Sequence, residues 1–336
     1  MVRREKEYPE KIIEMKRRYF LQAATAAGMV WAAAASSAMA DDWPNRPVKI
    51  IVPFAAGGAT DLLARPWAEW LSKVYKQQFV IENRGGASGL IGMEAAFRST
   101  PDGYTLFFSS NSPLVYQPQL RELKFDPRKF EVIARMGDMM SGFAVNPKTG
   151  FKTLKEMLDY AKRNPGKLTF GSSGPGTVTH MRLEALKFKT GVDIMHIPYR
   201  GGADSLTDLL AGVVDIMNEG STLPHVAAGK LTLLNINHTE RFAPFPDVPT
   251  LTEAGVKDAD IPVWFALYGP PGTPTDLIEK LNAKVNEISA LPETRKSMEK
   301  VSAVPVVQKL PELKKTWADD YKSIGALIKA ANIKLE

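Results

Sequence analysis

VKIIVPFAAGGATDLLARPWAEWL, residues 48–71, is the stretch of sequence that decides the fold. Its first five residues form an apolar run that ends at Pro53, which is typical of a buried β-strand. Gly57 and Gly58 then form a turn, and apolar residues recur at helical spacing from Leu62 to Leu71. The stretch therefore predicts a strand, a glycine turn and a helix, in that order.

The same alternation continues along the chain and sets the fold class. Further strands are predicted at 79–82, 104–108, 143–145, 168–171, 194–197, 214–217 and 264–268, with helices between several of them. Strands separated by helices indicate an α/β fold with mainly parallel sheets flanked by helices. The pattern restarts near residue 141 and returns near 264. We therefore expect lobe one to comprise residues 41–140 plus 264–336, and lobe two to comprise 141–263.

The first forty residues have a different composition from the rest. The basic group Lys16-Arg17-Arg18 precedes an Ala-rich apolar run from Tyr19 to Ala35 and the small-residue site Ala38-Met39-Ala40. This layout is typical of a secretory signal peptide, and the run is short for a membrane-spanning helix of about 20 apolar residues. We expect residues 1–40 to be a signal peptide cleaved after Ala40, and the protein to be exported to the periplasm. The pair Arg17-Arg18 resembles a twin-arginine signal, although the Sec route stays open.

Charge and composition exclude several classes of partner and cofactor. Residues 41–336 hold 36 Lys and Arg against 33 Asp and Glu, and the basic residues are scattered, so we expect no nucleic-acid partner. The chain has no Cys, which excludes disulfides and thiolate metal sites. Its four His residues show no metal-ligand spacing. We therefore expect no metal and no cofactor. We also expect the protein to be a monomer.

Several small polar loops follow predicted strands and could bind an anion. Glycines let the backbone approach a ligand, and the amides at the start of the next helix attract negative charge. One such loop spans 54–61, and an equivalent one spans 198–204. Two further loops contribute hydroxyl and amide groups at strand ends, where α/β sheets place ligands. Their candidate residues are Ser109, Asn111, Ser172, Ser173 and Thr177, with His180 as the best candidate among the histidines.

Motifs for chemistry on the ligand are missing. Neither Gly57-Gly58 nor Gly201-Gly202 completes a dinucleotide-binding or P-loop motif. The segment Gly171-Ser172-Ser173-Gly174 does not match the nucleophile elbow of a hydrolase. These observations favour a binding protein over an enzyme.

Taken together, these segments resemble one family. They are PFAAGG at 53–58 with Asp61, ENR at 82–84, PDGYTL at 101–106, GSSG at 171–174, PYRGG at 198–202, LTDLLAG at 206–212 and GTP at 272–274. The chain is similar in these segments to the tripartite tricarboxylate transporter substrate receptors, also called the Bug family. The likeness extends over essentially all of residues 42–336.

The resemblance implies a two-lobed periplasmic binding protein fold with the ligand cleft between the lobes. It also implies capture of a small organic carboxylate by backbone amides and hydroxyls, with Phe54 beside the ligand, for delivery to a two-component membrane permease. An alternative reading is an extracytoplasmic sensor that presents the carboxylate to a signalling partner. Carried over to this chain, the implied cradle is Ala56, Gly58, Thr60 and Asp61 opposite Tyr199, Arg200, Gly201 and Ala203.

The chain departs from many relatives at Gly85, where they have Pro, and in the second glycine loop, and the second departure together with one further acid leaves the charge of the ligand open. Many relatives have Gly-Ala-Pro-Ala where this chain has Gly202-Ala203-Asp204-Ser205, so that Asp204 places a carboxylate in the predicted site. Glu219 places another carboxylate after a lobe-two strand. We therefore expect a mono- or dicarboxylate with an apolar or aromatic body in preference to a tricarboxylate.

Overall fold

The computed structural model describes residues 43–257, 259–261 and 263–335. The chain divides into a unit that ends at Asn45 and a compact unit from Arg46 to Glu336. The predicted signal peptide, residues 1–40, lies outside the described residues. Within the described part of the chain, no helix has both the length and the apolar character needed to cross a membrane. All contacts below belong to the second unit.

Six strands form the first sheet, sheet A, in the order β11-β4-β10-β3-β1-β2. Its first three strands in the chain run parallel, with Val48 opposite Phe79 at the start of the β1–β2 pair. The returning strand β10 is inserted antiparallel between β3 and β4. The strand bounds are β1 Val48–Val52, β2 Phe79–Asn83, β3 Thr105–Ser110, β4 Glu131–Met139, β10 Trp264–Gly269 and β11 Ala303–Val304.

Five shorter strands form the second sheet, sheet B, in the order β7-β6-β8-β5-β9. Strand β6 runs parallel to both of its neighbours, whereas β5 runs antiparallel to β8 and β9. The strand bounds are β5 Ala144–Val145, β6 Thr169–Ser172, β7 Met195–Pro198, β8 Ile216–Met217 and β9 Thr232–Leu233.

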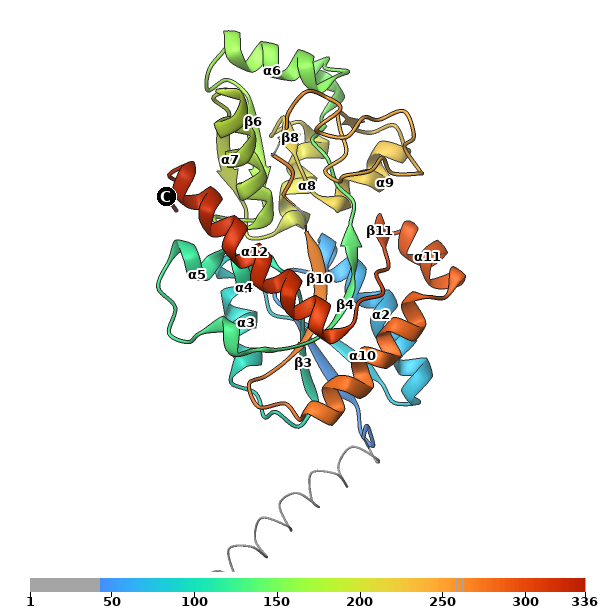
Figure 1. The fold of residues 1–336 in the computed structure, drawn as a ribbon. Helices are drawn as coiled ribbons and strands as arrows, with labels where there is room; N and C mark the ends of the chain where they lie inside the picture. Colours follow the sequence, from blue (N-terminus) through green and yellow to red (C-terminus); the bar gives the residue numbers. More distant parts are fainter. Residues whose placement is uncertain (1–42, 258, 262, 336) are drawn as a thin grey trace, which may run out of the picture. The chain divides into compact units, whose positions relative to one another are not determined.

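Helices surround both sheets (Figure 1). The start of helix α6 is fixed by its local sequence, because the Thr153 hydroxyl and the Glu156 carboxylate form a capping box there. The α-helical bounds are α2 Ala59–Tyr75, α3 Leu90–Phe97, α4 Ser112–Val115, α5 Gln117–Leu120, α6 Leu154–Arg163, α7 Val178–Thr190, α8 Gly202–Ala211, α9 Leu223–Ala227, α10 Thr275–Ser289, α11 Pro292–Glu299 and α12 Leu310–Ala330. Short 3₁₀ turns cover η1 Ala87–Gly89, η2 Pro127–Lys129, η3 Pro147–Thr149 and η4 Gly220–Thr222.

The two-sheet α/β fold predicted from the sequence is confirmed, but the sheets are mixed rather than mainly parallel. The chain leaves sheet A after Met139, enters sheet B at Ala144 and comes back at Trp264. A strand that returns from the other sheet reaches β3 and β4 from the opposite end. It therefore pairs antiparallel with both.

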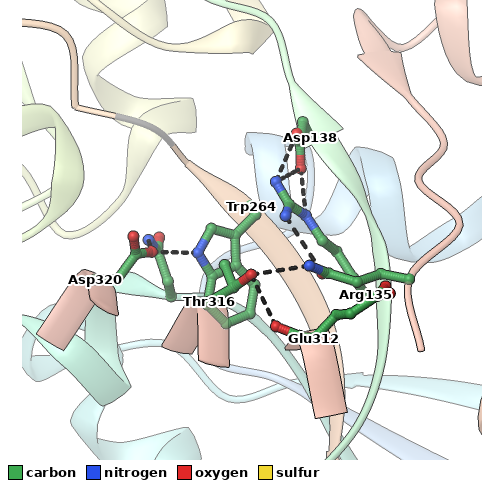
Figure 2. Close-up of polar contacts among 8 residues, drawn as sticks. Arg135, Asp138, Trp264, Glu312, Thr316 and Asp320 are labelled. Atoms are coloured by element: carbon green, nitrogen blue, oxygen red, sulfur yellow. Dashed lines mark hydrogen bonds and ion pairs between the residues drawn. The ribbon is translucent and has the colours of Figure 1, made fainter. Parts of the chain in front are cut away.

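Helix α12 connects the cores of both sheets. Leu313 belongs to the apolar core beside sheet A, and Ile324 belongs to the core beside sheet B. Polar contacts add to this packing (Figure 2): the Trp264 indole N–H donates to the Asp320 carboxylate, and the Gln308 amide donates to the Thr316 hydroxyl at 2.8 Å. The helix therefore closes the chain over both lobes.

Strand β4 is an element that the sequence analysis did not predict. Its apolar pattern is interrupted by Arg135, Gly137 and Asp138, and its pairing with β10 shifts register at two places. Arg135 Nε donates to Asp138 Oδ1 at 2.8 Å, and this pairing lets two charged side chains lie within a mostly buried strand (Figure 2). A strand that contains a partly buried ion pair and shifts of register lacks the regular pattern that identifies strands.

Candidate functional site

A cavity lies where loops of the two sheets meet. Sheet A and its connections contribute Phe54, Gly58, Ala59, Thr60, Ser110, Ser112, Met139, Val263 and Phe265 to its wall. Sheet B and its connections contribute Ser173, Thr177, Val178, Thr179, Arg182, Gly202, Glu219 and Gly220. Five predicted ligand contacts are therefore brought together here: Phe54, Gly58, Thr60, Ser173 and Thr177.

The first glycine loop is held by side chains behind it. Asp61 is 1% exposed and accepts hydrogen bonds from the Gly57 amide at 2.9 Å and from Arg65 Nε at 2.9 Å. Asn83 Nδ2 donates at 3.0 Å to both Asp61 Oδ1 and the Phe54 carbonyl. Burial alone would raise the pKa of Asp61, but the hydrogen bonds from Arg65, Gly57 and Asn83 together lower it. Asp61 is thus an ionised side chain that stabilises the loop. Ala56 of the same loop is exposed.

The second glycine loop lies against the first one. A β-carbon at Gly58 would stand 3.8 Å from the Ala203 amide nitrogen, and one at Gly201 would stand 4.0 Å from the Ala55 nitrogen. Arg200 and Asp204 are exposed at the rim. The Tyr199 hydroxyl donates to Asp208 at 2.6 Å, and burial together with this bond raises the pKa of Tyr199 to about 12.

A third loop, 172–177, is folded on itself beside the cavity. The Ser172 hydroxyl bonds with His196 Nε2 at 2.6 Å, and the Thr177 hydroxyl donates to the Gly174 carbonyl at 2.7 Å. His180 Nδ1 accepts the Gly176 amide at 3.0 Å, and the His180 ring stacks on His196 with centroids 4.1 Å apart. Burial and the nearby Lys187 charge lower the pKa of His180 to about 4, so it is neutral near pH 7. The cavity wall includes Ser173 and Thr177 but not Ser172 or His180.

The end of strand β3 and the start of helix α4 contribute hydroxyl groups to the cavity. Ser110 and Ser112 line it, whereas the predicted contacts Ser109 and Asn111 are buried elsewhere. Asn111 Nδ2 donates to Asp320 of α12 at 3.1 Å. Within β3, successive residues point to opposite sides, so Ser109 and Ser110 face different ways. Asn111 and Ser112 lie after the strand, at the start of α4.

Two charged side chains of the cavity wall are absent from the predicted contacts. Arg182 is buried and donates to the Ile261 carbonyl at 2.9 Å, to Ser141 Oγ at 2.6 Å and to Asn218 Oδ1 at 3.2 Å. Glu219 is partly buried, and burial raises its pKa against the lowering effect of its hydrogen bonds from Ser173 and Ala59. An arginine in the middle of a helix carries no sequence signal of its own, whereas the position of Glu219 after a strand did mark it as an acid near the site.

The wall chemistry suits an anion with an apolar body. Helices α2 and α8 both begin at the cavity, and the amides in the first turn of a helix favour negative charge. Phe54, Met139 and Phe265 supply apolar surface beside these amides. Among the described residues, no group of three or more His, Asp or Glu is arranged to hold a metal ion.

Comparison with known proteins gives a consistent family assignment. Residues 63–333 match the model of the tripartite tricarboxylate transporter family receptor. Protein BugT of Bordetella pertussis is 33% identical over 309 residues, which cover 90% of this chain and 94% of BugT.

Solved structures agree in fold over nearly the same range. A structure described as a periplasmic transporter is 35% identical, with a TM-score of 0.84, and the match covers 88% of this chain and 100% of the other. Rpa4515 of R. palustris with adipate is 30% identical, with a TM-score of 0.84 and coverage of 87% and 99%. MatC from Rhodopseudomonas palustris with bound malate is 28% identical, with a TM-score of 0.79 and coverage of 85% and 100%.

Proposed function

Because the chain belongs to the tripartite tricarboxylate transporter receptor family, we propose that it captures a small organic carboxylate in the periplasm and delivers it to a two-component membrane permease. The family is one of receptors, so the chain is a solute-binding protein and not an enzyme. The observation that carries the proposal is the cavity at which helices α2 and α8 both begin.

The chemistry of the cavity supports a carboxylate ligand. Backbone amides at the two helix starts supply donors without side-chain bulk, and the hydroxyls of Thr60, Ser110, Ser112 and Thr179 supply further groups. The two related proteins from R. palustris contain the dicarboxylates adipate and malate. We infer a mono- or dicarboxylate, with Phe54 and Phe265 beside its apolar or aromatic body.

Closure around the ligand follows from the placement of these groups. Contacts from both lobes act together only when the lobes meet, so a ligand that uses both sets shifts the protein toward the closed form. The permease can then distinguish the loaded receptor from the empty one by its conformation.

A thermal-shift screen tests the ligand class. The purified protein would be heated with aliphatic and aromatic mono-, di- and tricarboxylates, and with sugars and amines as other solute classes. A ligand that binds only the folded state raises the melting temperature, because it stabilises that state. At a ligand concentration of a hundred times Kd, the stabilisation is about 2.7 kcal/mol. A selective rise with carboxylates supports the proposal, and a rise confined to another solute class would overturn it.

A substitution at the second glycine loop tests the location of the site. Gly201 has extended backbone angles that any residue can adopt, and its β-carbon position lies 4.0 Å from the Ala55 nitrogen of the first glycine loop, beside the cavity-lining Gly202. Gly201→Val should therefore fold normally but lose carboxylate binding, because the branched side chain separates the two loops. The control is Ala211→Val, which adds two methyl groups at the exposed end of the same helix. Equal affinity in both variants would place the ligand elsewhere.

A further inference from the structure

The Glu219 carboxylate joins the two lobes at the cavity. Its Oε1 atom accepts a hydrogen bond from the Ala59 amide of α2 at 3.3 Å. Its Oε2 atom accepts the Ser173 hydroxyl at 2.9 Å. Ala59 follows the first glycine loop, whereas Glu219 and Ser173 follow strands of sheet B. The side chain therefore brings a carboxyl group from one lobe to the first helical amide of the other.

The start of a second helix touches the same carboxylate. A β-carbon at Gly202, the first residue of α8, would stand 2.0 Å from Glu219 Oε2 and 2.3 Å from Oε1. Such distances leave no room for any side chain at Gly202, so the carboxylate lies directly against the backbone of α8. The positive ends of two helix dipoles thus converge on one carboxyl group of the protein itself, where a solute anion would otherwise bind.

Little space remains in the cavity with Glu219 in this place. The volume is about 40 Å³, which accommodates roughly three water molecules. A dicarboxylate such as malate or adipate has about ten non-hydrogen atoms, against roughly three oxygen atoms for that amount of water. The arrangement described here and a bound dicarboxylate are therefore mutually exclusive, so either the lobes separate or Glu219 moves before a ligand enters.

We propose that Glu219 is a built-in competitor of the ligand: its carboxylate takes the converging helix amides in the empty protein, and the carboxylate of the solute binds by displacing it. This inference rests on the proposed function, because it assumes that the solute carries a carboxylate. A competing closed state lowers the apparent affinity, because only the remaining fraction of the protein is competent to bind the ligand. Glu219 thereby sets how tightly the receptor holds its solute.

Calorimetric titration of adipate and malate into three variants tests the competition. Glu219→Gln keeps the shape of the side chain but removes its charge, and Glu219→Ala removes both. Both should bind the dicarboxylate more tightly than the wild type, by about tenfold in Kd, which equals about 1.4 kcal/mol. Asp247→Asn, which removes a charge from an exposed loop of the same lobe, is the matched control and should bind like the wild type. Unchanged or weaker binding in both Glu219 variants would overturn the proposal.

Small-angle X-ray scattering of the ligand-free proteins gives a second, independent measurement. Wild type should be compact without ligand, whereas Glu219→Ala should have a larger radius of gyration that contracts when ligand is added. Equal radii for the two ligand-free proteins, together with tighter binding by Glu219→Ala, would show that Glu219 competes by moving its side chain and not by holding the lobes together; equal radii with unchanged binding would overturn the competitor role. If the wild type binds no carboxylate but does bind another solute class, the proposed function fails. If it binds carboxylates and the variants bind no tighter, the competitor role alone fails.

Discussion

Two loops on opposite sides of the cavity use the same backbone device with different chemistry. In lobe one the Gly57 amide donates to the Asp61 carboxylate, four residues later, at 2.9 Å. In lobe two the Gly176 amide donates to Nδ1 of His180, also four residues later, at 3.0 Å. Both glycines have positive φ angles, 84° and 69°, which favour glycine. Each loop is thus anchored by the first turn of the helix that follows it.

The difference between the two anchors is their charge. Asp61 is an anion held by Arg65 and Asn83, and its pKa is lowered overall. His180 is a neutral acceptor, because burial lowers its pKa to about 4. The same geometry is therefore stabilised by charge in lobe one and by an uncharged ring in lobe two. This comparison predicts that the two loops respond differently to mutation and to acid.

Removal of the charged anchor should have the largest effect. Asp61→Ala removes the acceptor of the Gly57 amide and of the Arg65 guanidinium, and leaves Asn83 with only the Phe54 carbonyl as acceptor. We expect a loss of about 3 kcal/mol in the free energy of unfolding, because all the hydrogen bonds to one buried carboxylate are lost together. Urea unfolding at pH 7 measures this loss. Carboxylate affinity should fall as well, since the amides of the first glycine loop are no longer held in place.

The control for this prediction is the exposed acid at the start of α8. Asp204 also lies in the first turn of a helix, but its side chain is exposed. Asp204→Ala should change the free energy of unfolding by less than about 0.5 kcal/mol. Similar losses in both variants would show that helix-end charge, and not the anchoring of the loop, explains the effect.

The neutral anchor should make lobe two sensitive to mild acid. Because the folded pKa of His180 is about 4 and the ordinary value is near 6.5, the unfolded chain binds a proton between these values that the folded protein does not. The contribution of neutral His180 to the free energy of unfolding is complete above pH 6.5 and is lost as the pH falls toward 4. The loss amounts to at most about 3 kcal/mol at pH 4. Asp61 acts in the same direction but below the ordinary Asp value near 3.9.

His180→Gln separates this titration from other acid effects. Glutamine can still accept the Gly176 amide but does not titrate, so the variant should lose less stability than wild type between pH 7 and pH 4.5. The measurement is the free energy of unfolding in urea at both pH values. Parallel losses in the two proteins would assign the acid sensitivity to other groups.

The order of strands and helices could be read from the sequence where apolar patterns were regular. Strand β1 begins and ends where the pattern predicts, because Pro53 gives it a clear boundary. Strand β4 could not be read, because its charges are paired within the strand. The antiparallel return of β10 depends on pairing between residues far apart in the chain.

The candidate site could be predicted at the level of loops but not of side chains. Sequence places Ser109 and Ser110 side by side, yet only the pairing of β3 decides which one faces the cavity. Asp61 looks like a ligand contact because it follows two glycines, and the structure shows it holding the loop from behind. Arg182 reaches the cavity wall from the second turn of α7, which only the tertiary fold reveals.

Side chains added at the two glycines should destabilise the two loops to different extents. A β-carbon at Gly176 would stand 2.8 Å from Leu120 Cδ1 and 2.9 Å from Gln117 Nε2, in addition to the backbone strain of a positive φ. Gly176→Ala should therefore lower the free energy of unfolding by about 2 kcal/mol, from strain and overpacking together. A loss below about 1 kcal/mol would mean that the neighbouring side chains move aside easily.

The smallest effect is expected at the equivalent glycine of lobe one. Gly57 has the same left-handed backbone, but a β-carbon there would meet no described atom within 4 Å. Gly57→Ala should cost about 1 kcal/mol, from backbone strain alone. Urea unfolding of the two alanine variants side by side measures the difference, which isolates the packing around the lobe-two loop. Equal losses would mean that the Gly176 loop is no more tightly enclosed than the Gly57 loop, and that charge alone distinguishes the two anchors.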